Sequence, residues 1–223
     1  MSGVGHSRAG HATGRERVFT GRGGACGMLP STWEKQAIGR LLAMTLPIRT
    51  FGDPGLKINC AEVTDIDGST VTLCEDMIEA MYAAPGIGLA APQVGVLRRF
   101  FVFDLDDGDG PDALFNPEIV ESDGVWAYDE GCLSIPELYF PIERPKTILV
   151  KGINLDGDEV SFEADELFAR LVQHELDHLN GVLLLDHLDK DQRKDAMRIL
   201  RRRAEGLPTE DDPLGTTGRR GKL

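Results

Sequence analysis

The sequence predicts an α+β fold in which mostly antiparallel β-sheets wrap around a central helix. Two observations carry this prediction. Two long helical patterns occur, at residues 72–84 and 164–180, and short strand patterns crowd the segment between them. The second helix also carries the motif His-Glu-x-x-His. A chain of 223 residues can bury a sizeable core within one domain.

Composition argues against several classes of protein. The net charge of −13 argues against DNA binding. No run of about 18 apolar residues is present, so we expect no membrane span. The four cysteines are far apart and include no Cys-x-x-Cys pair, which favours a reducing, cytoplasmic compartment over a disulfide framework.

Both ends of the chain lack a core-forming pattern. Residues 1–44 are predicted to be a disordered extension, or to result from a start codon set too early, with Met44 as the alternative start and a short helix over 31–44. Residues 45–189 form the predicted catalytic domain. A C-terminal helix at 190–205 follows, and 206–223 are predicted to be a disordered tail.

Within the domain, each element has its own signal. The first helix presents Leu73, Met77 and Met81 as an inner stripe and ends at Pro85-Gly86. The glycine-rich stretch 86–93 is read either as a tight turn or as a functional loop. Strands are expected at 97–105, at 113–120 with a break at Asn116-Pro117, at 125–128, and at 147–153 and 159–162, the last two as a hairpin.

The motif at residues 173–181 predicts a metal site. His174 and His178 are one helical turn apart, so both imidazoles point the same way and can hold one ion. Glu175 lies one step round the helix, where it can reach a metal-bound water without being a ligand. Asp165 is the expected N-cap of this helix, and Gly181 is expected at its C-terminal end.

The third ligand is left open by the residues alone. Cys132 lies in a turn after a strand and can present a thiolate, although a small buried cysteine is the commoner role. His187 and Asp186, nine and eight residues after His178, are the other candidates. The ligand types by themselves favour zinc.

Three segments together resemble the peptide deformylase family. Residues 86–93 (GIGLAAPQ), 130–134 (EGCLS) and 173–181 (QHELDHLNG) are similar to that family's three motifs, in the same order, within a resemblance covering about 46–188. The resemblance implies removal of the N-formyl group from the initiator methionine of new polypeptides, after attack by a metal-bound hydroxide.

The resemblance also assigns roles to individual residues. It implies Cys132, His174 and His178 as metal ligands and Glu175 as general base and acid. It gives the Gln93 side chain and the Leu133 N–H as donors to the oxyanion. The implied metal is Fe²⁺, with Zn²⁺, Ni²⁺ or Co²⁺ as substitutes. The residues implied to orient the ligands are Glu130, Arg144 and Asp177.

The substrate is expected to be an N-formylmethionyl nascent peptide lying beside residues 86–93 like an added strand. Ile87 and Gly88 are then expected to offer backbone groups, and an apolar pocket near Leu167 and Leu171 is expected to take the methionine side chain. A ribosome contact near the exit tunnel is a further expectation. The alternative is that the basic run 201–203 is simply the solvent-exposed end of the last helix.

Three residues depart from the family pattern. Tyr139 occupies the place of a groove arginine, Arg170 the place of an aliphatic pocket residue, and Pro85 the place of an acid. Arg170 is expected either to rim the pocket or to pair with an acid. Two other functions stay open: a zinc endopeptidase using His187 or Asp186, and a non-catalytic, metal-stabilised paralogue that binds the ribosome.

Overall fold

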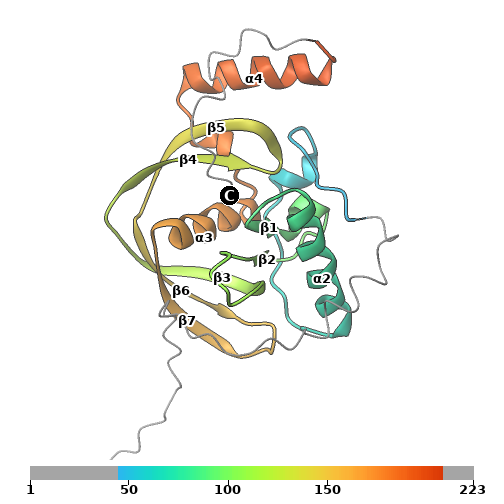
Figure 1. Cartoon of the computed structure of the whole chain (residues 1–223), viewed down its shortest axis with the longest axis vertical. Coiled ribbons are helices and arrows are strands. Elements are labelled where there is room, and N and C mark those ends of the chain that lie inside the picture. The colour runs from blue at the N-terminus through green and yellow to red at the C-terminus, as the bar shows by residue number, and fades with distance from the viewer. Residues whose placement is uncertain (1–44, 208–223) are drawn as a thin grey trace, which may run out of the picture.

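The computed structural model describes residues 45–207 (Figure 1). The expectations for residues 1–44, including the helix at 31–44, and for residues 208–223 lie outside the described residues. Within 45–207, no helix is long and apolar enough to cross a membrane.

Two antiparallel sheets make up the β-structure. The larger has five strands in the order β1-β2-β3-β6-β7, and the smaller pairs β4 with β5. The strands of the larger sheet are β1 (Gly88–Ala90), β2 (Phe100–Phe103), β3 (Asp112–Asp123), β6 (Thr147–Ile153) and β7 (Glu159–Asp165). Those of the smaller sheet are β4 (Trp126–Cys132) and β5 (Ile135–Arg144).

The helices occupy three different places around these sheets. They are α2 (Gly68–Ala83), α3 (Glu166–Leu179) and α4 (Lys190–Ala204), with short 3-10 turns η1 (Pro54–Lys57), η2 (Ala91–Val94) and η3 (Leu184–Asp186). Figure 1 shows α3 between the two sheets, α2 beside β1 and β2, and α4 on the outer side of β4 and β5. The predicted fold, with antiparallel sheets around a central motif-bearing helix, is confirmed.

Helix α3 is held from both sides by the core. Leu171 and Val172 of α3 pack in one cluster with Phe101 and Val150 of the larger sheet. On its other side, α3 directs polar and charged residues toward β4 and β5, where they are buried. The helix therefore has an apolar side that fixes its position and a polar side that is available for chemistry.

Helix α2 begins four residues earlier than the predicted start at residue 72. Asp67 is the N-cap, and its Oδ1 accepts a hydrogen bond from the Thr70 N–H at 2.8 Å. Met77 and Met81 are fully buried as predicted, whereas Leu73 is only half-buried. The short first turn carries no apolar signal, which is why periodicity alone placed the start too late.

The expected break at Asn116-Pro117 is a bulge inside a continuous strand. The β3–β6 register shifts between Phe115 and Glu118. Asn116 has a φ of 47°, and its side-chain amide makes reciprocal hydrogen bonds of 2.8 Å with the backbone N–H and C=O of Val63. The side chain thus replaces the ladder bonds lost at the bulge.

Strand β5 is absent from the sequence prediction, and β4 extends past the expected end at 128 to Cys132. Pro136 and Pro141 argue against a strand when only the sequence is considered. Strand β5 pairs with β4 alone, and one edge without a sheet partner tolerates proline. The hairpin of β6 and β7 is confirmed, as are Asp165 and Gly181 at the ends of α3.

We expect Asp67→Ala to lower stability at neutral pH, with a deficit that shrinks in acid. Hydrogen bonds from Ser69 and Thr70 lower the pKa of Asp67 from 3.8 to about 2. The ionised cap therefore stabilises the fold above pH about 4, and this contribution is lost as the pH falls toward about 2. Urea midpoints of the variant and the parent at pH 7, 5 and 3 measure the deficit. Asp65→Ala, the same charge change two residues away, is the control. A deficit that does not change with pH would contradict the capping role.

Candidate metal centre

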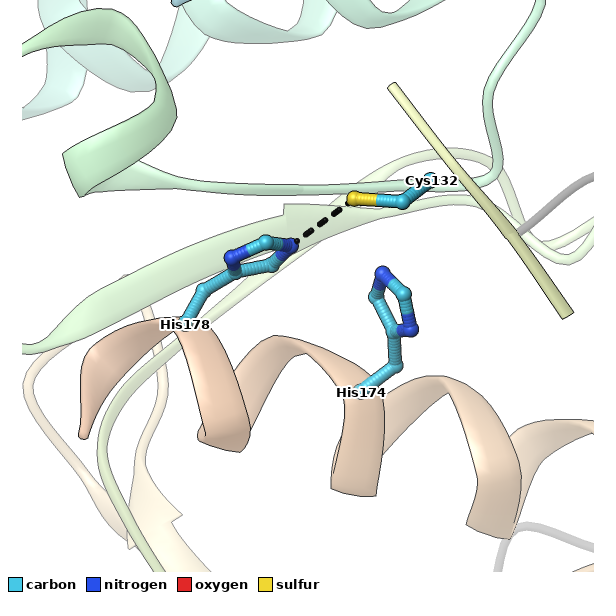
Figure 2. Close-up of side chains that lie close together, drawn as sticks. All are labelled: Cys132, His174 and His178. Atoms are coloured by element: carbon cyan, nitrogen blue, oxygen red, sulfur yellow. Dashed lines mark hydrogen bonds between the residues drawn. The ribbon is translucent and has the colours of Figure 1, made fainter. Parts of the chain in front are cut away.

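Three potential ligands converge between β4 and α3 (Figure 2). Cys132 is the last residue of β4, and His174 and His178 project from successive turns of α3. The Cys132 Sγ lies 3.2 Å from the His178 Nε2. One ligand atom from each of the three residues lies within 4.8 Å of the others, and all three residues are buried.

Cys132 and His174 stabilise each other's charged forms, and a metal ion would take the place of the His174 proton. Burial would raise the pKa of the Cys132 thiol, but the imidazoles of His178 and His174 hold it well below its usual range. Burial would likewise lower the pKa of His174, whereas the Cys132 sulfur and Glu130 raise it. A thiolate and two imidazoles bind a divalent ion with one position left open for water.

Glu130 contacts one of the three potential ligands, His174. The Glu130 Oε2 lies 3.1 Å from the His174 Nδ1, so the imidazole donates there and its Nε2 is directed toward the ligand group. Arg144 donates to both Glu130 oxygens, at 2.6 and 3.0 Å, and Arg170 donates to the Glu130 Oε1. Although burial opposes it, hydrogen bonds from His174 and Arg144 lower the pKa of Glu130.

Glu175 lies beside the ligand group and against β1. Its side chain is buried, and its Oε2 has no hydrogen-bond partner within residues 45–207. Burial raises the pKa of this carboxyl to about 6, close to the pH at which a proton acceptor and donor works best. A Cβ built on Gly88 would lie 2.5 Å from the Glu175 Oε1, so only glycine leaves room for the carboxylate there.

The glycine-rich stretch brings a third group to the site. Gln93, in η2, is buried and accepts the Ala90 N–H on its Oε1 at 2.7 Å. This bond turns the Gln93 Nε2 toward the ligands, where it donates to the Ser134 Oγ at 3.2 Å and lies 3.9 Å from the Cys132 Sγ. The stretch 86–93 therefore lies next to segments 130–134 and 173–181.

Comparison with known proteins agrees with this geometry. The sequence profile of the family "Polypeptide deformylase" matches residues 45–194. The chain belongs to this family. A peptide deformylase of Acidothermus cellulolyticus is 50% identical over 155 residues, which cover 70% of this chain and 85% of that protein. One from Clostridium botulinum is 49% identical over 143 residues, covering 64% and 96% of the two chains.

Solved structures give the same result. The crystal structure of the peptide deformylase from Thermotoga maritima is 48% identical, with a TM-score of 0.63 over 66% of this chain and 99% of that one. The enzyme from Ehrlichia chaffeensis, in complex with actinonin, is 36% identical, with a TM-score of 0.68 over 71% and 97%. Peptide deformylases are metal-dependent hydrolases that remove the N-formyl group from newly made polypeptides.

The residues expected to touch substrate lie around β1 and α3. Strand β1 is at an edge of the larger sheet. The Ile87 carbonyl accepts the Asp104 N–H at 2.9 Å, so that carbonyl faces β2. Leu171 is fully buried in the cluster against which Ile87 packs, while Leu167 is 38% exposed. The structure thus places Leu171 in the core cluster that Ile87 also contacts, and Leu167 at the surface.

The structure also shows the contacts of the alternative ligand candidates, of Arg170 and of one residue that was not predicted. His187 binds Asp177 at 2.7 Å, and Asp186 binds Lys57 and Arg193. The ligands that an endopeptidase would require are therefore engaged elsewhere. Arg170 pairs with an acid, one of its two expected positions. Ser134, which accepts a hydrogen bond from the Gln93 amide, was not predicted; it lies within the quoted motif at 130–134, next to Leu133.

We expect Gly88→Ala to lower the rate of formate release from a formyl-methionyl peptide about 100-fold, because displacing Glu175 by about 1 Å misaligns proton transfer. The φ of Gly88 is not positive, so alanine strains no backbone there and the loss comes from the collision with Glu175. Gly68→Ala is the matched control, since a Cβ at Gly68 meets nothing within 4 Å. A parental rate in Gly88→Ala would contradict the placement of Glu175.

Proposed function

We propose that Cys132, His174 and His178 hold the catalytic metal ion of this deformylase, and that Glu175 is its general base and acid. The observation that carries the proposal is the convergence of one thiolate and two imidazoles, within 4.8 Å of one another, beside a buried carboxyl. A metal ion at this position supplies an acidified water and a positive charge opposite the developing oxyanion.

The side chains of the protein then handle the protons and the charge. Glu175, with its raised pKa, takes a proton from the attacking water and returns it to the leaving amine. The Gln93 Nε2 and the Leu133 N–H donate to the oxyanion, because Gln93 is held by Ala90 with its amide toward Cys132. Losing one such donor typically lowers kcat by about 10²–10³.

The peptide is proposed to extend the larger sheet at its β1 edge. An edge strand presents backbone groups to which an extended peptide can bond. Ile87 and Gly88 are proposed to offer backbone groups to the peptide at this edge. The methionine side chain is proposed to lie near Leu167 and Leu171, on the side of α3 that faces the larger sheet.

Glu130, Arg144 and Asp177 are proposed to orient the ligands, through the chain of contacts from His174 to Glu130, Arg144 and Asp177. We propose Fe²⁺ as the native ion, with Zn²⁺, Ni²⁺ or Co²⁺ able to replace it. The family resemblance supports iron; the ligand types also suit zinc.

The setting in the cell is proposed from the substrate. Nascent chains emerge from the ribosome, so we propose a cytoplasmic enzyme that works near the exit tunnel, with the basic end of α4 (residues 201–203) toward ribosomal RNA. The buried free thiols Cys60 and Cys74 agree with a reducing compartment. We propose residues 45–189 as the catalytic domain and 190–205 as an appended helix.

Iron-loaded protein, assayed without oxygen, is expected to release formate from formyl-Met-Ala-Ser. Glu175→Gln should slow this at least 100-fold, because the proton carrier is lost. Cys132→Ser should be nearly inactive, because a ligand is lost. A chelator should abolish the activity, and added Fe²⁺ should restore it.

Cys60→Ser is the matched control for Cys132→Ser: it changes a buried thiol outside the ligand group and is expected to keep most of the activity. A folded, metal-replete parent that releases no formate would contradict the proposal. Parental activity in Cys132→Ser would contradict the ligand set.

A further inference from the structure

The carboxylate of Glu130 has all of its acceptor positions occupied. Its Oε1 accepts from the Arg144 Nε at 2.6 Å and from the Arg170 Nη1, and its Oε2 accepts from the Arg144 Nη2 at 3.0 Å and from the His174 Nδ1 at 3.1 Å. A carboxylate offers about four lone-pair sites. Four donors therefore fix both the position and the rotation of this group.

Arg170 is itself fixed by the second sheet. It is 1% exposed, donates to the Ile142 carbonyl at 3.0 Å and to the Trp126 carbonyl, and its guanidinium lies 4.9 Å from the centre of the Trp126 ring and 5.6 Å from that of Tyr128. Backbone acceptors and ring faces together hold a planar guanidinium in one orientation. Arg170 thus ties α3 to β4 and β5 next to Glu130.

The charges of the cluster require both arginines. Arg144 is shared between Glu130 and Asp177, which lies 2.9 Å from the Arg144 Nη1. Arg170 forms its ion pair with Glu130. Without Arg170, the two carboxylates of the cluster would share one guanidinium, and Glu130 has no exposed surface. A buried charge that loses its partner is strongly unfavourable.

The side chain of Arg170 points away from the side of α3 that faces the larger sheet. Its contacts are with Glu130, Trp126 and Ile142 of β4 and β5, whereas its neighbour Leu171 packs with the larger sheet. Arg170 and His174 are one turn apart on α3, and each binds one oxygen of the same carboxylate.

We infer that Arg170 is a positioning residue for the metal ligand His174, acting through Glu130 and not through the peptide pocket. The inference rests on the proposed metal site and extends it to this residue. Arg170 keeps the Glu130 Oε2 aligned with the His174 Nδ1, so that the His174 Nε2 stays directed at the metal. Loss of a residue directly behind a ligand, as Glu130 is, typically changes metal affinity or activity by about 10- to 100-fold, and Arg170 acts one contact further out.

The test compares the cobalt-loaded parent, Arg170→Leu and Arg170→Lys. Two quantities are measured: the rate at which cobalt passes to a chelator, and kcat and KM for formyl-Met-Ala-Ser. We expect Arg170→Leu to lose cobalt at least about tenfold faster, with a lower kcat and a KM within about twofold of the parent. Arg170→Lys retains the charge but not the planar fork, so it is expected to lie between the two.

Met77→Ala is the control for general destabilisation, because Met77 is fully buried in the α2 cluster away from Glu130. It is expected to lower stability and to retain cobalt like the parent. If Arg170→Leu fails to fold, faster cobalt loss from Arg170→Lys than from Met77→Ala still supports the inference.

Two results would overturn the inference that Arg170 positions His174. One is cobalt retention equal to the parent in the folded Arg170 variants; the other is a raised KM with an unchanged kcat, which would make Arg170 a pocket residue. A parent that binds no cobalt would overturn the proposed metal site as well, so the two failures are distinguishable.

Discussion

An ionised carboxylate that is removed from water has to be matched by positive charge and hydrogen-bond donors. Glu130 is such a group, fully buried between β4 and α3. Its donors come from two elements: Arg144 from β5, and Arg170 and His174 from α3. The hairpin of β4 and β5 has no other strand beside it in the described chain, so this cluster is a main constraint on how it meets the helix.

The position of the metal site follows from the same constraint. Cys132 is two residues after Glu130 on the same strand, and His174 is bonded to Glu130 directly. Fixing one carboxylate therefore fixes the thiolate and an imidazole relative to each other. His178 depends less on it: its Nδ1 has no partner within the described residues, and its place follows from its position one turn after His174 on α3. The polar side of the helix is organised around a single anion.

The backbone of residues 86–93 comes close to the side chains of the site. Gly88 lies against Glu175, and Gly86 lies against the side chain of Leu133, whose Cδ1 would be 2.7 Å from a Cβ at that glycine. Two glycines thus let the loop at 86–93 come within reach of the Glu175 carboxyl and of Leu133. Gln93 reaches the site because the backbone N–H of Ala90, in the same turn, binds its side-chain oxygen. The site needs small residues at these points as much as it needs its ligands.

Local patterns predicted the parts of the structure that local physics determines. The spacing of His174 and His178, the caps of α3 and the hairpin of β6 and β7 are of this kind. Local patterns missed or misplaced the start of α2, the bulge at Asn116 and strand β5. A side-chain cap decides the first, a distant backbone partner the second and a sheet edge the third. Arg170 was ambiguous for the same reason. A buried arginine one turn before a ligand requires an acid, but only the packing of β4 against α3 identifies Glu130 as that acid.

The most direct test of the central role of Glu130 is the zinc affinity of Glu130→Gln, measured by competition with a chelator. Glutamine has nearly the same shape, but its amide NH₂ would face a guanidinium or imidazole N–H where an acceptor is needed. The account predicts about 10- to 100-fold weaker zinc binding in a protein that still folds. Zinc affinity equal to that of the parent would show that the site is organised without this carboxylate, and would contradict the account.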